Sequence, residues 1–303
     1  MAINFYRIKK WCKMLTGKSL LHVNQDCGKV FSSSFIKGYY NNLTEKVLKD
    51  KNNINNGDYI PQFKTENGDL IFFPIAVFQY GLGCYDLYLL TDEELYLQKF
   101  FACVRWAIDN QNENGAFDCM SFIFPAHPYS AMCQGEAVSL LLRAFVHSKE
   151  KKYYQAAKNA LDFMLKPLEE GGTTKYEDNK ITFFEYTNSP PVMNGWIFAM
   201  FGLFDWTLVC AEERYRIVYE NALQNLIDNL PLYDCGYWTK YDADKRIASP
   251  FYHRLHIAQM EALGKITGQP VFEEYMLKWK KYQKSPMKKS RAFLKKAIQK
   301  ISE

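Results

Sequence analysis

The chain has 303 residues, of which 48% are hydrophobic and 23% charged, and its formal net charge at pH 7 is +5. This length and composition allow a sizeable core in one large domain or two small ones. No run of 18 apolar residues occurs, which excludes a membrane-spanning helix. The basic N-terminus lacks the continuous apolar stretch of a signal peptide.

Eight cysteines are scattered along the chain, and no two of them have the C-x-x-C spacing of a zinc site. Several lie in apolar helical patterns, as small buried hydrophobic residues do. We therefore expect no metal, no other cofactor and a reducing compartment, the cytoplasm. We expect no nucleic acid partner.

Positive charge is concentrated at both ends. Residues 1–19 hold five basic residues and no acid, and residues 278–303 hold ten basic residues and one acid, so the middle of the chain is acidic. Either end could dock on an anionic lipid surface or polysaccharide, or serve only as a solubilising tail. Residues 286–303 form a basic amphipathic pattern, which predicts a helix that lies on a membrane surface or packs on the domain.

Residues 1–70 have the least regular pattern and are predicted to be an N-terminal extension. Residues 59–64 and 70–73 flank a turn at 66–69, which predicts a β-hairpin.

From residue 75 the pattern becomes helical and paired. The predicted helices cover residues 76–90, 93–110, 130–148, 151–166, 191–209, 212–229, 251–266 and 270–284. Four helix hairpins favour a mainly α fold, an incomplete (α/α) toroid over residues 71–285, with a helical solenoid as the alternative.

Three polar and aromatic clusters stand at predicted helix entrances. They are Phe184-Glu185-Tyr186, Tyr241-Asp242 and the run from Tyr252 to His256. In a fold of antiparallel helix pairs, the entrances on one side face a common cleft. We expect the chemistry of this protein to take place there.

The order and spacing of these clusters resemble the C-terminal catalytic domain of the D-glucuronyl C5-epimerases, over roughly residues 70 to 284. The matching segments are Pro74-Ile75, Gln79-Tyr80-Gly81-Leu82, Tyr129 to Ala137, Leu142 to Phe145, Glu185-Tyr186, Met193 to Trp196, Phe201 to Asp205, Leu230 to Asp234, Tyr241-Asp242 and Tyr252-His253-x-x-His256-Ile257.

This resemblance implies an α/α toroid that converts D-glucuronate to L-iduronate within an anionic polysaccharide. The short N-terminal extension suggests a bacterial-type short form that modifies a capsular or other surface glycan, heparosan-like or different. Peripheral contact with the inner face of the membrane through the basic termini, and a homodimer, are further expectations.

Epimerisation at C5 removes a weakly acidic C–H proton beside a carboxylate and returns a proton to the other face of the ring. The protein must neutralise that carboxylate and supply an acid/base group on each face. Glu185, in an apolar setting that raises a carboxyl pKa, fits one role. Tyr252 fits the other, and the resemblance also places Tyr186 and Tyr241 in the active site.

Other residues are candidates for binding the substrate or for holding charge near Tyr252. The family has an arginine shortly after its Tyr-Asp pair, and here that arginine is displaced to Arg246. The candidates for substrate binding are Tyr129, Gln134, Asn194, His253, Arg254, His256 and Arg246.

Two alternatives from other classes stay open. A uronic-acid lyase needs the same proton abstraction, and an inverting glycoside hydrolase needs a second carboxylate, for which Asp242 and Asp234 are the candidates. A polysaccharide-binding protein without catalysis would keep the same aromatic cleft.

Overall fold

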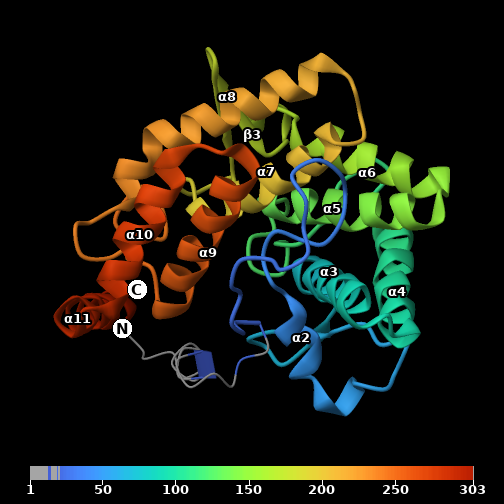
Figure 1. The fold of residues 1–303 in the computed structure, drawn as a ribbon, viewed down its shortest axis with the longest axis horizontal. Coiled ribbons are helices and arrows are strands. Elements are labelled where there is room, and N and C mark those ends of the chain that lie inside the picture. Colours follow the sequence, from blue (N-terminus) through green and yellow to red (C-terminus); the bar gives the residue numbers. More distant parts are fainter. Residues whose placement is uncertain (1–12, 15–18, 20, 303) are drawn as a thin grey trace.

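The computed structural model describes residues 13–14, 19 and 21–302. Within these ranges, consecutive long helices pair into four hairpins that follow one another around an arc (Figure 1). The hairpins are α3 (Pro74–Thr91) with α4 (Glu94–Asn110), α5 (Ala131–Ser148) with α6 (Lys151–Met164), α7 (Met193–Thr207) with α8 (Glu213–Asn229), and α9 (Pro250–Thr267) with α10 (Pro270–Lys284).

The hairpins form two layers. Helices α3, α5, α7 and α9 contact one another in that order and form the inner layer, while α4, α6, α8 and α10 lie outside. Nearly every residue of α7 is buried, as expected of an inner helix that is apolar all round. This arrangement is the predicted incomplete α/α toroid, and it leaves an opening between α3 and α9.

Helices α5 and α7 approach closely because glycines meet at their crossing. A Cβ atom on Gly202 would stand 2.3 Å from the carbonyl oxygen of Gly135, and one on Gly135 would stand 2.6 Å from the Cα of Ala199. No larger residue fits either position without moving a helix.

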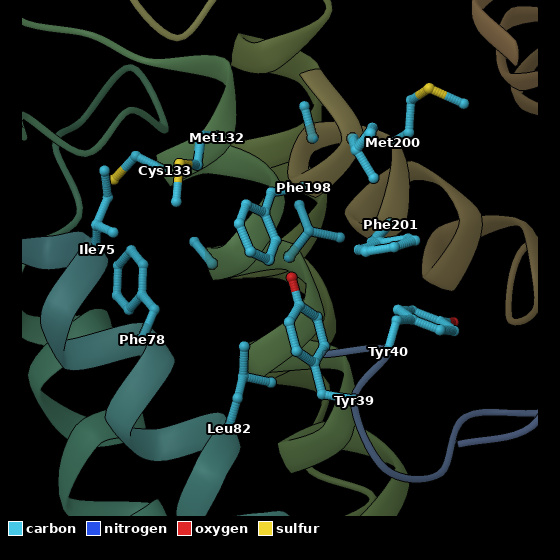
Figure 2. Packing of buried hydrophobic residues seen from close by; sticks show 14 of the residues in the cluster. Tyr39, Tyr40, Ile75, Phe78, Leu82, Met132, Cys133, Phe198, Met200 and Phe201 are labelled. Carbon is cyan, nitrogen blue, oxygen red and sulfur yellow. The ribbon is translucent and has the colours of Figure 1, made fainter. Parts of the chain in front are cut away.

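The segment before α2 (Thr44–Leu48) packs into the concave side of the arc. Figure 2 shows Tyr39 and Tyr40 among side chains of the inner helices, such as Phe78 and Phe201. The extension and the toroid therefore share one hydrophobic core.

Polar contacts from three inner helices hold this segment. The backbone N–H of Tyr39 donates to Asp86, and the guanidinium of Arg143 donates to the carbonyl of Gly38. Asp205 accepts from the hydroxyl of Tyr40 at 2.6 Å and from Arg143 at 2.6 Å, with both side chains of the ion pair fully buried. Arg143 is thus a structural anchor for this segment.

The remaining elements are short. The predicted hairpin is present as β1 (Phe63–Lys64) paired with β2 (Leu70–Ile71), and a second antiparallel hairpin joins β3 (Thr174–Glu177) to β4 (Lys180–Phe183). Short 3-10 helices cover η1 (Lys51–Asn53), η2 (Leu168–Glu170) and η3 (Leu230–Tyr233).

The basic C-terminal segment forms helix α11 (Pro286–Ser302), which packs on the domain. Gln299 accepts a hydrogen bond from the backbone of Ile247 and donates one to the carbonyl of Lys245. The packed face carries Ala292, whereas Leu294 of the predicted apolar stripe is 63% exposed. The predicted membrane contact of this helix stays a prediction.

None of the helices in the described ranges is long and apolar enough to cross a lipid bilayer.

Candidate active site

A cavity of about 160 Å³ lies at the opening of the arc, between α3 and α9. Its lining includes Glu185, Tyr186, Asn194 and Tyr252. Another part of the lining is apolar and largely aromatic, with contributions from the β1–β2 region and from the loop before α5. Its members are Phe63, Phe73, Met120, Phe122 and Ile123.

Glu185 stands two residues after strand β4, so the β3–β4 hairpin presents it to the cavity. The carbonyl of Phe184 accepts a hydrogen bond from the first residue of α5, which fixes the end of the hairpin against that helix. Gly195 makes room for the side chain, because a Cβ atom there would stand 2.5 Å from Oε2 of Glu185. Helix α7 therefore approaches this carboxyl group closely at Asn194-Gly195.

The carboxyl group of Glu185 is buried but hydrogen-bonded. Asn194 Nδ2 donates to Oε2 at 3.3 Å, and the hydroxyl of Tyr241 donates to Oε1 at 3.3 Å. Burial raises the pKa of Glu185 to about 7, although these donors, Tyr186 and the charge of Arg246 all act to lower it. The group can thus both take and release a proton near neutral pH.

Tyr252 lies in the first turn of α9. That turn is well defined because Pro250 opens the helix and the side chain of Ser249 accepts from the backbone N–H of Tyr252. Its ring packs edge-on against Tyr241 with the centroids 4.7 Å apart. Burial and the neighbouring Glu185 raise the pKa of Tyr252, while a hydrogen bond with Tyr241 and the charge of Arg246 lower it.

Tyr186 and Tyr241 complete a cluster of three phenols around Glu185. Burial raises the pKa of both phenols well above the ordinary value, and the charge of Glu185 raises it further. Both are therefore neutral hydroxyls at pH 7, available as hydrogen-bond donors.

Arg246 reaches this cluster because the chain turns back at Asp242. That carboxylate accepts from the backbone N–H groups of Asp244 and Arg246 and forms an ion pair with the Arg246 guanidinium. The guanidinium lies 5.1 Å from the centroid of the Tyr241 ring. The charge of Arg246 lowers the pKa of Tyr252. From the sequence, the candidates for this role also included His253, Arg254 and His256.

His253, Arg254 and His256, which follow Tyr252 in the chain, do not line the cavity. His253 stacks on Trp238 with the centroids 3.6 Å apart, and His256 hydrogen-bonds to Thr239 through Nδ1. Burial lowers the pKa of His253 to about 3 and that of His256 well below its usual range, so both rings are neutral at pH 7. Arg254 lies exposed on the opposite side of the helix turn.

Tyr129 and Gln134 also lie outside the residues that line the cavity. Tyr129 packs edge-on against Phe163 with the centroids 4.6 Å apart. Gln134 is fully buried, accepts from the backbone N–H of Phe117 and donates to the carbonyl of the same residue. Both side chains fasten the loop before α5, which carries part of the apolar lining.

Sequence reasoning missed the contribution of the N-terminal extension. His22, Gln25 and Lys46 line the cavity, together with Gln79 of α3. The resemblance includes the segment of Gln79, but no periodic pattern marks Lys46. Among the described residues, no group of three or more His, Cys, Asp or Glu side chains is arranged to hold a metal ion.

Comparison with known proteins assigns the family. Residues 106–281, more than half of the chain, match the family described as D-glucuronyl C5-epimerase C-terminus. The chain belongs to this family. The match covers Glu185, Tyr186, Tyr241, Arg246 and Tyr252.

Individual relatives are more distant. The chain is 26% identical over 215 residues to D-glucuronyl C5-epimerase of Caenorhabditis elegans, covering 61% of this chain and 35% of that protein. It is 30% identical over 171 residues to an uncharacterized protein of Methanocaldococcus jannaschii, covering 53% of this chain and 56% of that one. The chain thus spans about a third to a half of the length of these relatives.

Two solved structures share a weaker likeness. An unsaturated glucuronyl hydrolase specific for heparin gives a TM-score of 0.48 at 15% identity, over 68% of this chain and 64% of that one. The unsaturated glucuronyl hydrolase of Bacillus sp. GL1 gives 0.46 at 9% identity, over 82% and 66%. Likenesses at this level do not distinguish one reaction from another.

Proposed function

We propose that this protein is an epimerase that inverts C5 of D-glucuronate residues to L-iduronate within a polysaccharide. The observation that carries the proposal is that Glu185 and Tyr252 line the same cavity, in a chain of the epimerase family. These groups are of the two kinds that proton removal and proton return require.

In the proposed reaction the Glu185 carboxylate takes the C5 proton, and the electron pair of the C–H bond enters the sugar carboxylate as an enolate. The Tyr252 hydroxyl gives its proton to C5 from the opposite face and becomes a phenolate. The charge of Arg246 stabilises that phenolate. The reverse reaction uses the same two groups with their roles exchanged.

The proton balance is restored within the cluster. After one turnover Glu185 is neutral and Tyr252 has lost a proton. The Tyr241 hydroxyl lies within hydrogen-bonding reach of both groups. We propose that Tyr241 gives its proton to Tyr252 and receives one from Glu185, so that the enzyme returns to its starting state without an added reactant.

Of the alternatives, the glycoside hydrolase has weaker support. A glycoside hydrolase needs a free second carboxylate, but Asp242 is paired with Arg246, and Asp234 is paired with Lys278 and accepts from Trp279 and Tyr282. A lyase would use the same base yet expel the C4 oxygen.

For the setting, we propose a capsular or other surface glycan modified in the cytoplasm. This compartment is supported by the seven cysteines of the described residues, all of which are free thiols.

Product analysis tests the proposed reaction. A glucuronate-containing polymer such as heparosan is incubated with the protein, and its length, its uronate composition and its absorbance near the band of 4,5-unsaturated uronates are followed. We expect iduronate to appear in chains of unchanged length. New reducing ends would show a hydrolase, and unsaturated uronate would show a lyase.

A further inference from the structure

Lys46 gives the catalytic cavity a positive charge that comes from outside the matched family region. Among the described residues that line the cavity, Lys46 is the only lysine or arginine, and Glu185 is the only carboxylate. Arg246, which the family pattern would offer as the cation for the substrate, does not line the cavity and is engaged with Asp242.

The ammonium group of Lys46 is buried and mostly free to donate. The residue is 6% exposed, and its Nζ donates to the carbonyl of Leu21 at 2.7 Å. No carboxylate of the described residues lies within ion-pair distance of it. An ammonium group has three N–H donors, so donors remain for a ligand in the cavity.

Lys99 provides a useful contrast. It is fully buried too, and its Nζ donates to the carbonyl of Asn53 at 2.6 Å and to the hydroxyl of Tyr80 at 3.2 Å. It does not line the catalytic cavity. The two lysines therefore share burial and a backbone acceptor but differ in their access to a ligand.

Glu136 is the carboxyl group whose charge acts on Lys46, but it does not neutralise the ammonium group. Glu136 is fully buried and accepts from Gln79 Nε2 at 2.7 Å, and burial raises its pKa to about 8. Its carboxyl group is thus largely protonated at pH 7. Burial lowers the pKa of Lys46 to about 8, which leaves the ammonium largely charged at the same pH. A buried charge of this kind is stabilised by a counter-ion.

We propose that Lys46 binds the carboxylate of the reacting uronate and thereby makes the cavity selective for uronate over neutral sugars. The inference rests on the proposed function, because it takes the reacting uronate to lie in the cavity that Lys46, Glu185 and Tyr252 line. A cation on that carboxylate also stabilises the enolate, in which its negative charge increases. In this chain Lys46 then performs the task that the displaced arginine leaves open.

The test compares binding of two probes that differ only in charge. One is a heparosan tetrasaccharide, and the other is the same tetrasaccharide after its carboxyl groups have been reduced to alcohols. Lys46→Gln keeps a hydrogen-bond donor without the charge, Lys46→Met keeps the volume, and Lys99→Met is the matched control. Thermal melting shows whether each variant is folded, and calorimetry gives each affinity.

We expect both Lys46 variants to bind the charged probe at least ~10-fold more weakly than wild type, the scale of one charge-assisted hydrogen bond. Their affinity for the reduced probe should equal that of wild type, and Lys99→Met should match wild type for both. Turnover by the Lys46 variants should also fall at saturating substrate, because the enolate loses its cation.

Equal loss of both probes would show that Lys46 only holds the segment of Leu21 in place, and would overturn the inference. Unchanged binding of the charged probe, or a loss of affinity with full turnover at saturation, would overturn it as well. The proposed function fails separately: charge-dependent binding through Lys46 without any change at C5 would refute the epimerase and leave Lys46 as a uronate-binding residue.

Discussion

Glu185 combines two properties that the removal of a very weakly acidic carbon proton requires. Its carboxyl group is shielded from water, and the donors around it still allow the ionised form to exist near pH 7. A solvated carboxylate would be too weak a base, and an unsupported buried one would stay protonated. We therefore expect a substitution of Glu185 to change both catalysis and stability.

The stability effect depends on pH. Folding raises the pKa of Glu185 from 4.5 to about 7 through burial. Protonated Glu185 therefore makes its whole contribution to the free energy of unfolding below pH 4.5, and this contribution is lost as the pH rises through 7. Glu185→Gln, which cannot ionise, should be more stable than wild type by about 3 kcal/mol at pH 8 and equally stable near pH 4.

Urea unfolding of both proteins at the two pH values measures this difference. A stability gain for Glu185→Gln that is the same at pH 4 and pH 8 would contradict the raised pKa. Asn194 Nδ2 can donate to the amide oxygen of the new side chain, and the Tyr241 hydroxyl can accept from its amide nitrogen, so the variant should keep its fold.

Gly195 tests the placement of Glu185 without touching its chemistry. An added Cβ would overlap Oε2 and the Cβ of Glu185, so Gly195→Ala should displace the carboxyl group and lower turnover by ~10-fold or more. Gly264→Ala, in α9, is the matched control, since its nearest neighbour atom would be 3.7 Å away. That variant should retain turnover and gain ~0.5–1 kcal/mol of stability. Equal activity of the two variants would refute the placement.

At the scale of elements, the predicted helices agree closely with the observed ones because each has a long apolar stripe. Helix α10 covers the predicted residues 270–284, and α5 begins one residue later than predicted. The β3–β4 hairpin was missed, although Asp178-Asn179 between two alternating segments is a turn signal, and Asp178 adopts a positive φ. That omission hid the element that presents Glu185.

Thr91 and Glu94 have the sequence spacing of a capping box, but none forms. Helix α3 continues through Thr91, whose hydroxyl donates to the carbonyl of Leu87. The αL residue Asp92 then separates the two helices of the hairpin. A short tight connection between antiparallel helices thus overrides a local capping motif.

Helix α11 supports the loop that carries Arg246. Its Gln299 binds both neighbours of that arginine, and Arg291 lies 4.0 Å from the centroid of the Tyr237 ring. If this helix only lay on a membrane surface, deletion of residues 286–303 would leave activity on a soluble polymer intact. The packing predicts that this deletion lowers turnover.

A point substitution gives the sharper test. Gln299→Ala should lower kcat by about fivefold, the equivalent of ~1 kcal/mol for weakened support of the loop. Lys295→Ala, on the exposed side of the same helix, should leave kcat unchanged. If both variants have the kcat of wild type, α11 does not act on the site.

At the scale of the whole molecule, the extension and the toroid depend on each other. The site could be assembled only in part from the sequence, since helical periodicity shows which residues are buried but not whether they face the core or the cavity. For this reason the sequence did not show that His253 and His256 face the core rather than the cavity. The sequence did not indicate Lys46 as a cavity residue, because the five residues of α2 are too few to show helical periodicity.

The Arg143–Asp205 pair tests the shared core. Arg143→Met leaves the buried carboxylate of Asp205 with Tyr40 as its remaining donor, which should destabilise the protein by about 3–5 kcal/mol. Residues 36–47 and the inner helices should unfold in one transition, as amide hydrogen exchange would show. Separate unfolding of residues 36–47 in the wild type would contradict a single core.

We propose that Glu185 and Tyr252 exchange the C5 proton of a uronate. The most direct test of this proposal is NMR of heparosan incubated with the protein in deuterated water. We expect deuterium to replace the C5 proton while the chain stays intact, and we expect Glu185→Gln and Tyr252→Phe to lower this exchange ~10²-fold or more. Retention of the C5 proton by the wild-type protein, or full exchange by both variants, would contradict it.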